Sequence, residues 1–140
     1  MKIVYYSESG NTKRMAELIA EGIEVEGEHV NLYDVESVSA KDLENEDVII
    51  LGCPAQGAES LEQANMEPLV EELEPKIKGK KVALFGSYGW GDGEWMRNWE
   101  ERMEAAGAVL VAKGLIVHEE PDEEDKAKCI SFGRRIAASV

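Results

Sequence analysis

Positive charge and aromatic side chains are both scarce in this sequence. Of its 140 residues, 15 are Lys or Arg and 29 are Asp or Glu, so the formal net charge is −14, and aromatic residues make up 6%. A protein with this charge is repelled by the phosphate backbone of nucleic acids and by anionic lipid surfaces. We therefore expect neither a nucleic-acid partner nor a membrane partner.

Long apolar runs are also missing. The longest purely aliphatic run, VIIL at 48–51, is far shorter than the roughly 20 apolar residues that span a bilayer, and the apolar run in the first ten residues is too short for a secretory signal. We expect a cytoplasmic protein. Its 140 residues, 44% of them hydrophobic, suffice for one compact domain, and we predict a single domain over 1–140.

Cysteine and histidine occur only twice each, as Cys53, Cys129, His29 and His118. Two cysteines are too few for an iron–sulfur cluster or a tetrahedral thiolate zinc site, and a reducing cytoplasm argues against a disulfide. The histidines have no metal-ligand partner at a useful spacing. We predict two buried thiols and no metal site.

Short β-branched runs alternate with segments of helical periodicity, without a repeat or a linker. The predicted strands cover residues 2–6, 29–33, 47–52, 81–86 and 109–117. Apolar residues spaced three and four apart predict helices around 15–23, 69–77, 96–103 and 129–137, with a short or poorly formed helix at 37–45. This alternation indicates an α/β fold, a doubly wound five-stranded parallel sheet of order 2-1-3-4-5 with helices on both faces.

In such a sheet a ligand binds beyond the carboxyl ends of the strands, at the switch point between strands 1 and 3. Three predicted loops leave those ends, at 7–12, 53–60 and 87–94. The first, SESGNT, offers hydroxyl and amide side chains and a glycine just before a helix, from Ser7, Ser9, Gly10, Asn11 and Thr12. Free amides and the helix dipole favour an anion there.

The loop itself contains no Lys or Arg before Lys13, which suggests neutral donors around a terminal monophosphate, with Glu8 turned outward. An ordinary helix start capped by Ser or Thr is the alternative interpretation of this loop. The other two loops, CPAQGAES and GSYGWGDGEW, add glycines and put Tyr88 and Trp90 on a turn. A planar ring against Trp90 and a phosphate at the first loop describe flavin mononucleotide, FMN. The alternative is that Trp90 covers the core, as we predict for Trp95 and Trp99.

On the motifs SESGNT, LGCPAQG and GKKVALFGSYGWGDGEWM (79–96), the whole chain resembles the flavodoxin family, short-chain type. The resemblance implies a flavodoxin-like fold and a low-potential one-electron carrier, not an enzyme, with non-covalent FMN. It implies transient partners, redox enzymes with basic docking faces, and a monomer is the simplest state. The implied cofactor-binding residues are Ser7, Glu8, Ser9, Gly10, Asn11, Thr12, Pro54, Ala55, Gln56, Gly57, Ala58, Glu59, Ser87, Tyr88, Gly89, Trp90 and Gly91.

The resemblance also implies a redox switch at the Gly57–Ala58 peptide. In the family the carbonyl at the Gly57 position flips to accept a hydrogen bond from flavin N5–H, which stabilises the neutral semiquinone, and Glu59 would accept from N3–H. The flipped turn requires a positive φ at Gly57 and the unflipped turn requires one at Ala58, where alanine is strained by about 1–2 kcal/mol. We hypothesise that Ala58 favours the flipped form.

Two positions depart from the family pattern. Gln56 stands where many short-chain relatives have methionine, and Glu119 stands where some offer an asparagine, so the loop at 116–122 is left out of the predicted site.

Acidic residues are expected around the site and would repel a second electron; they are Glu59, Glu62, Asp92, Glu94 and the run 119–125. For most of that run, a solvated surface that confers solubility is the alternative interpretation. Two other functions remain open: an FMN-dependent NAD(P)H quinone or nitro reductase, and a flavodoxin-like accessory protein that activates one metalloenzyme.

Overall fold

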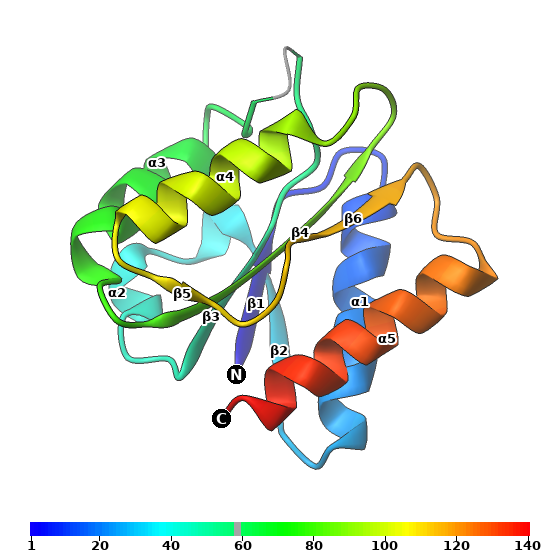
Figure 1. Ribbon diagram of the computed structural model, residues 1–140, viewed down its shortest axis with the longest axis horizontal. Coiled ribbons are helices and arrows are strands. Elements are labelled where there is room, and N and C mark those ends of the chain that lie inside the picture. Colours follow the sequence, from blue (N-terminus) through cyan, green and yellow to red (C-terminus); the bar gives the residue numbers. More distant parts are fainter. Residues whose placement is uncertain (58–59) are drawn as a thin grey trace.

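The computed structural model describes residues 1–57 and 60–140 and shows a parallel sheet between two layers of helices (Figure 1). The strands are β1 (Lys2–Tyr5), β2 (Asn31–Asp34), β3 (Val48–Gly52), β4 (Lys81–Tyr88), β5 (Val109–Leu110) and β6 (Leu115–His118). They follow the order β2-β1-β3-β4-β5, with β6 also paired to β4, and every pair is parallel. The predicted fold class and strand order are confirmed.

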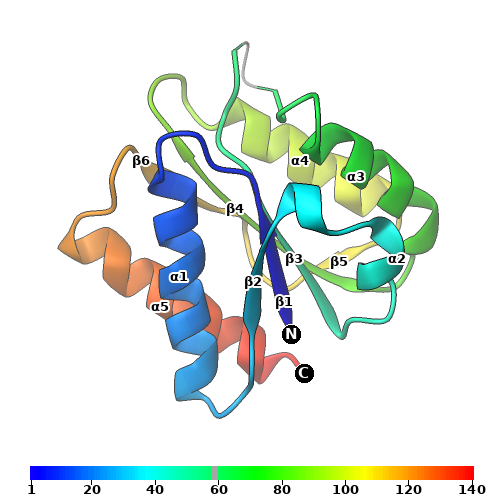
Figure 2. The same cartoon turned by 180° about the vertical axis from the view of Figure 1, so that it is seen from behind.

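The helices are α1 (Asn11–Val25), α2 (Ala40–Leu43), α3 (Met66–Leu73), α4 (Glu94–Ala105) and α5 (Glu123–Ala138), with 3-10 turns η1 (Val35–Ser37) and η2 (Glu74–Lys76). Helices α1 and α5 cover one face of the sheet, and α3 and α4 cover the other (Figures 1 and 2). The helix predicted as far as Ile77 ends at Leu73 because Pro75 cannot donate to an α-helical ladder. Ile77 is nevertheless buried.

The central strand β3 supplies both cores because side chains alternate between the faces of a strand. Val48 and Ile50 pack among the residues of α1 and α5, and Ile49 and Leu51 pack among those of α3 and α4. All five residues of β3 are buried. The predicted burial of Cys53, Cys129, Trp95 and Trp99 is confirmed, and burial raises the pKa of both thiols to about 12.

The prediction of one continuous fifth strand over 109–117 is wrong. Between Val82 and Phe85, β4 advances three residues while its neighbour advances five, from Leu110 to Leu115. The Val111 amide still donates to the Val82 carbonyl oxygen at 3.0 Å. The chain then leaves the ladder at 112–114, where the Gly114 amide donates to the Glu100 carboxylate of α4 at 2.8 Å. A Cβ on Gly114 would lie 2.5 Å from the Met96 sulfur, so a larger residue at this position would require the Met96 side chain to move.

None of the helices in the described part of the chain is long and apolar enough to cross a membrane.

Candidate flavin site

A cleft of about 190 Å³ opens at the carboxyl edge of the sheet, where the three predicted loops meet. Its walls are formed by Glu8, Ser9, Asn11, Thr12, Pro54, Ala55, Gln56, Ser87, Tyr88, Gly89 and Glu119. Ten of these eleven residues belong to the predicted site. The structure thus brings together segments that are far apart in the sequence, as expected for a switch-point site.

Buried hydrogen bonds hold the three loops to one another. The hydroxyl groups of Thr12 and Ser87 lie 2.7 Å apart, and the Ala55 amide donates to the Ser87 carbonyl oxygen at 3.0 Å. Ser87 therefore contacts both other loops. Because Thr12 and Ser87 are both buried, this contact fixes the relative position of the first and third loops.

The first loop wraps around the start of α1. Gly10 precedes the helix with φ 95°, a conformation that favours glycine, and a Cβ there would meet nothing within 4 Å. The Ser7 hydroxyl accepts from the amides of Gly10 and Lys13 at 3.2 Å each, so part of the helix start is capped by serine, as in the alternative interpretation. Ser9, Asn11 and Thr12 instead line the cleft.

Glu8 is exposed, as predicted, and it also forms part of the cleft wall. Its carboxylate accepts from the Tyr6 hydroxyl at 3.0 Å and from the Gln56 side-chain amide at 3.5 Å, which joins the first and second loops. Burial, the hydrogen bond to Glu8 and the charges of Glu8 and Glu62 raise the pKa of Tyr6. Two carboxylates, Glu8 of the cleft wall and Glu62, therefore act on Tyr6, the residue that precedes the first loop.

The second loop narrows to a pair of backbone hydrogen bonds between Gln56 and Ser60, at 3.0 and 2.9 Å. Gly57 has φ 43°, the sign that the flipped turn requires at this position. Ala58 and Glu59, which carry the rest of the predicted switch and the predicted N3–H acceptor, lie outside the described residues. The switch stays a prediction.

The third loop carries two aromatic side chains with different surroundings. Tyr88 lines the cleft and contacts the rings of Trp95 and His118, with centroids 5.7 and 5.2 Å away. Trp90 is 67% exposed, so it does not cover the core as Trp95 and Trp99 do. Of the predicted site residues within the described part, the cleft walls leave out Ser7, Gly10, Gly57, Trp90 and Gly91.

Glu119 is a cleft residue that sequence reasoning left out. It is the single non-glycine residue of positive φ in 1–57 and 60–140, at 58°, and its amide donates to the Tyr88 carbonyl oxygen at 2.8 Å. His118 reaches both the Gly89 carbonyl oxygen, at 3.1 Å, and the Glu119 carboxylate, at 3.3 Å. The position of Glu119 in the sequence could have indicated this, because it directly follows β6, at the sheet edge where ligands bind.

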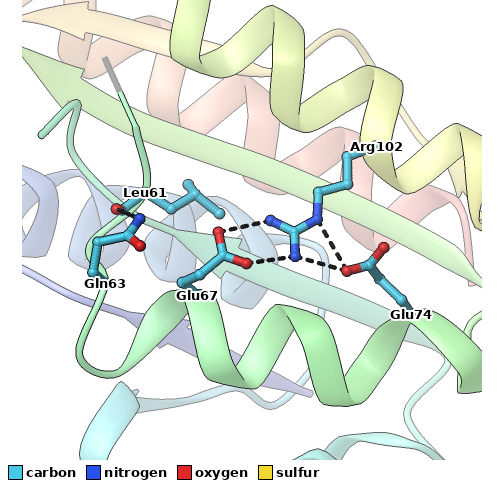
Figure 3. A network of polar contacts seen from close by, with 5 residues as sticks. All are labelled: Leu61, Gln63, Glu67, Glu74 and Arg102. Atoms are coloured by element: carbon cyan, nitrogen blue, oxygen red, sulfur yellow. Dashed lines mark hydrogen bonds and ion pairs between the residues drawn. The ribbon is translucent and has the colours of Figure 1, made fainter. Parts of the chain in front are cut away.

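A polar network beside the second loop joins the helices of one layer (Figure 3). Arg102 of α4 makes two hydrogen bonds to Glu67 of α3, at 2.8 and 2.5 Å, and two to Glu74 of η2, at 3.0 and 2.7 Å. The guanidinium lowers the pKa of Glu67. Helix α3, which follows the second loop, is thereby fastened to α4, which follows the third.

This fold and this polar cleft define a doubly wound α/β domain with a candidate ligand site at its switch point. A family model described as flavodoxin matches residues 3–133. The flavodoxin of Clostridium beijerinckii is 58% identical over 137 residues, covering 98% of this chain and 99% of that protein. The flavodoxin of Megasphaera elsdenii is 46% identical over 128 residues, covering 91% and 93%.

Among solved structures, the solution structure of two-electron reduced Megasphaera elsdenii flavodoxin matches with a TM-score of 0.88 at 43% identity, over 98% of both chains. The chain belongs to the flavodoxin family, electron-transfer proteins that bind FMN. It is thus a carrier of electrons and not an enzyme. The site suits this cofactor, because hydroxyl and amide donors surround a helix start and an indole is exposed on a neighbouring loop.

Proposed function

We propose that this chain is a low-potential one-electron carrier whose three loops hold FMN, and that it works as a cytoplasmic monomer. The observation that carries the proposal is the meeting of the first loop with Tyr88 and Gly89 of the third in one cleft at the switch point. The proposed site consists of the seventeen cofactor-binding residues predicted from the sequence, which lie in the three loops. FMN supplies the redox chemistry when bound; the chain binds it, orients it and sets its electrostatic environment.

The first loop is proposed to take the phosphate. Ser9, Asn11 and Thr12 present neutral donors to the cleft at the positive end of the α1 dipole, and the first turn of α1 contains no acidic residue. The Ser7 hydroxyl stabilises the loop by accepting hydrogen bonds from the Gly10 and Lys13 amides. Neutral donors suit a terminal monophosphate, which stays attached and is not transferred.

The ring system is proposed to lie between the second and third loops. Trp90 exposes two-thirds of its surface on a glycine-flanked turn, which a stacked planar ring would cover. Ala55 and Gln56 of the second loop line the cleft. The Glu8 carboxylate holds the Gln56 amide, so that side of the site is more polar than a methionine would make it.

The acidic surroundings are proposed to make the second electron costly. One charge about 10 Å away at an effective dielectric of about 20 contributes roughly 1.7 kcal/mol, about 70 mV for a one-electron couple before screening. Glu8 and Glu119 stand in the cleft wall. Asp92 contributes less than its position suggested, because Arg97 pairs with it at 3.0 Å.

A visible spectrum of the purified protein, followed through stepwise anaerobic reduction with dithionite, tests this function. Two oxidised-flavin bands that give way to a broad long-wavelength absorbance and then bleach would support a one-electron carrier. Flavin that bleaches without that absorbance, or that NAD(P)H alone bleaches, would point to a two-electron reductase. A colourless protein that takes up no added FMN would contradict the proposal.

The partners are proposed to be redox enzymes with basic docking faces, since the net charge is −14. Electrostatic steering of this kind gives rapid and transient encounters that weaken with salt. Electron transfer to a ferredoxin-dependent reductase should slow steeply between low and high ionic strength. A rate that does not depend on salt, or stable capture of one dedicated partner, would favour the accessory role.

A further inference from the structure

Three buried polar side chains stand out in the described part of the chain: Thr12, Glu62 and Ser87. Thr12 and Ser87 join the first and third loops of the cleft. Glu62 lies at the end of the second loop and is 8% exposed. A buried carboxylate is costly unless its oxygens are satisfied, so its partners indicate what it does.

The Glu62 carboxylate is fixed by the start of α3. Its two oxygens accept from the backbone amides of Ala64, Asn65 and Met66, each at 2.9 Å. Asn65, which stands at the N-cap position, makes no side-chain cap bond of its own. Glu62 therefore takes the place of the cap, and the positive end of the helix compensates its buried charge.

The backbone of the same residue closes the second loop. The Glu62 amide donates to the Cys53 sulfur at 3.4 Å, which links the two ends of the loop that follows β3. The Cys53 amide donates to the Phe85 carbonyl oxygen at 3.1 Å, and its own carbonyl oxygen accepts from the Trp95 indole at 3.2 Å. The loop end is thus fastened to the sheet and, through Trp95, to α4.

A second link lies further along the same loop. Gln56 and Ser60 exchange two backbone hydrogen bonds, and Gln56 lines the cleft. Glu62 stands two residues beyond Ser60, so its fixed side chain restricts the position of this paired segment. On the other side, the Glu67 amide donates to the Glu62 carbonyl oxygen at 2.9 Å, and Glu67 is held by Arg102 (Figure 3).

We propose that Glu62 is a positioning residue for flavin binding. Fixed by the amides of Ala64, Asn65 and Met66 at the start of α3, it closes the second loop against Cys53 and holds Gln56 in the cleft wall. The inference rests on the proposed function for its effect on FMN, but the closure of the loop is a property of the protein alone. The Glu62 carboxylate is also one of the groups that raise the pKa of Tyr6, the residue before the first loop.

Glu62→Gln is the variant that tests the proposal. One carboxylate oxygen becomes an NH₂ group that points at a backbone donor, and the charge is removed. Amide exchange at Gln56 and Ser60 of the apoprotein should accelerate by about tenfold, and the dissociation constant of FMN should rise by about tenfold. The potential of the second electron should become less negative.

Glu72→Gln is the matched control, because it removes an equal charge from an exposed position of α3. It should leave amide exchange and FMN affinity unchanged. If Glu62→Gln accelerates exchange only in the first turn of α3, Glu62 is a helix cap and the proposal is wrong. It is also wrong if the two variants have the same FMN affinity and the same potentials.

Cys53→Ala provides a second route should Glu62→Gln fail to fold. It removes the acceptor of the Glu62 amide and leaves the α3 cap intact, so exchange at Gln56 and Ser60 should again accelerate, while Cys53→Ser should restore protection. Unchanged exchange in Cys53→Ala would overturn the closure. Failure of the wild-type protein to bind FMN would instead overturn the proposed function, and the exchange measurement would still decide the role of Glu62.

Discussion

The side-chain oxygen atoms of Thr12 and Ser87 lie 2.7 Å apart although the two residues are separated by 75 positions in the chain. Thr12 belongs to the first turn of α1, and Ser87 to the end of β4. Both are buried, and the Ser87 amide also approaches the Thr12 hydroxyl, at 3.4 Å. This pair is the direct link between the loop proposed for the phosphate and the loop proposed for the ring.

Thr12→Val should therefore destabilise the apoprotein by about 1–3 kcal/mol, because valine leaves the buried Ser87 hydroxyl without this partner. A double-mutant cycle with Ser87→Ala should give a coupling energy of about 0.5–3 kcal/mol. Urea unfolding of the wild-type, two single-variant and double-variant apoproteins measures this coupling energy. Additive effects of the two substitutions would mean that the hydroxyls do not interact.

The contact between α1 and α5 predicts a sharp intolerance at two glycines. A Cβ on Gly133 would lie 2.0 Å from the Ile19 carbonyl oxygen, and one on Gly22 would lie 2.0 Å from that of Ile130. Gly133→Ala should destabilise the protein by about 1–3 kcal/mol through overpacking, despite the higher helix propensity of alanine. Glu21→Ala, exposed on the same helix as Gly22, is the control. In thermal unfolding, Gly133→Ala should have a clearly lower Tm than wild type, and Glu21→Ala should have nearly the same Tm as wild type.

Much of this fold was predictable because its signals are local. The β-branched run VIIL is buried on both faces in β3, and this continuous burial is what a central parallel strand requires. The hydroxyl-rich loop before α1 was likewise recognisable from residue type and position alone. Such features need no knowledge of which segments meet in space.

The features that the sequence did not predict depend on tertiary contacts. At the break between β5 and β6, Gly114 lies against Met96 and donates to Glu100, both of α4, and no local pattern in 109–117 reveals these contacts. Glu119 was judged by its residue type, whereas its place in the cleft follows from the pairing of β6 with β4. Glu62 was predicted as one of several repelling charges, which stays a prediction; its second role as the buried cap at the start of α3 depends on contacts that the sequence did not indicate. Periodicity alone does not reveal such contacts.

The Arg102 network predicts a pH-dependent contribution to stability. Arg102→Met should cost about 1–2 kcal/mol at pH 7, a moderate value because the three side chains are 20–34% exposed and solvent screens them. Arg102 lowers the pKa of Glu67 in the folded state below its value in the unfolded chain. The stabilisation is therefore complete above the unfolded-state pKa and is lost as the pH falls through the folded-state pKa.

Urea unfolding of wild type and Arg102→Met at pH 7 and near pH 3 measures this dependence. The difference in unfolding free energy should shrink at the lower pH. Arg102→Lys should recover only part of the stability, since an ammonium group cannot reproduce the two parallel hydrogen bonds to Glu67. A difference that stays constant from pH 7 to pH 3 would assign the role of Arg102 to packing.

Trp90 offers the most direct test of where the ring system binds. Because its side chain is 67% exposed, Trp90→Ala should leave the apoprotein's unfolding free energy within about 0.5 kcal/mol of wild type. FMN affinity should nevertheless fall about tenfold, since stacking on an aromatic face contributes about 1.4 kcal/mol. The FMN affinity of Trp90→Phe should lie between those of wild type and Trp90→Ala. Val25→Ala, which removes another exposed apolar side chain, is the control, and recovery of flavin fluorescence on dilution measures each dissociation constant. Equal affinities for wild type and Trp90→Ala would place the ring away from this indole.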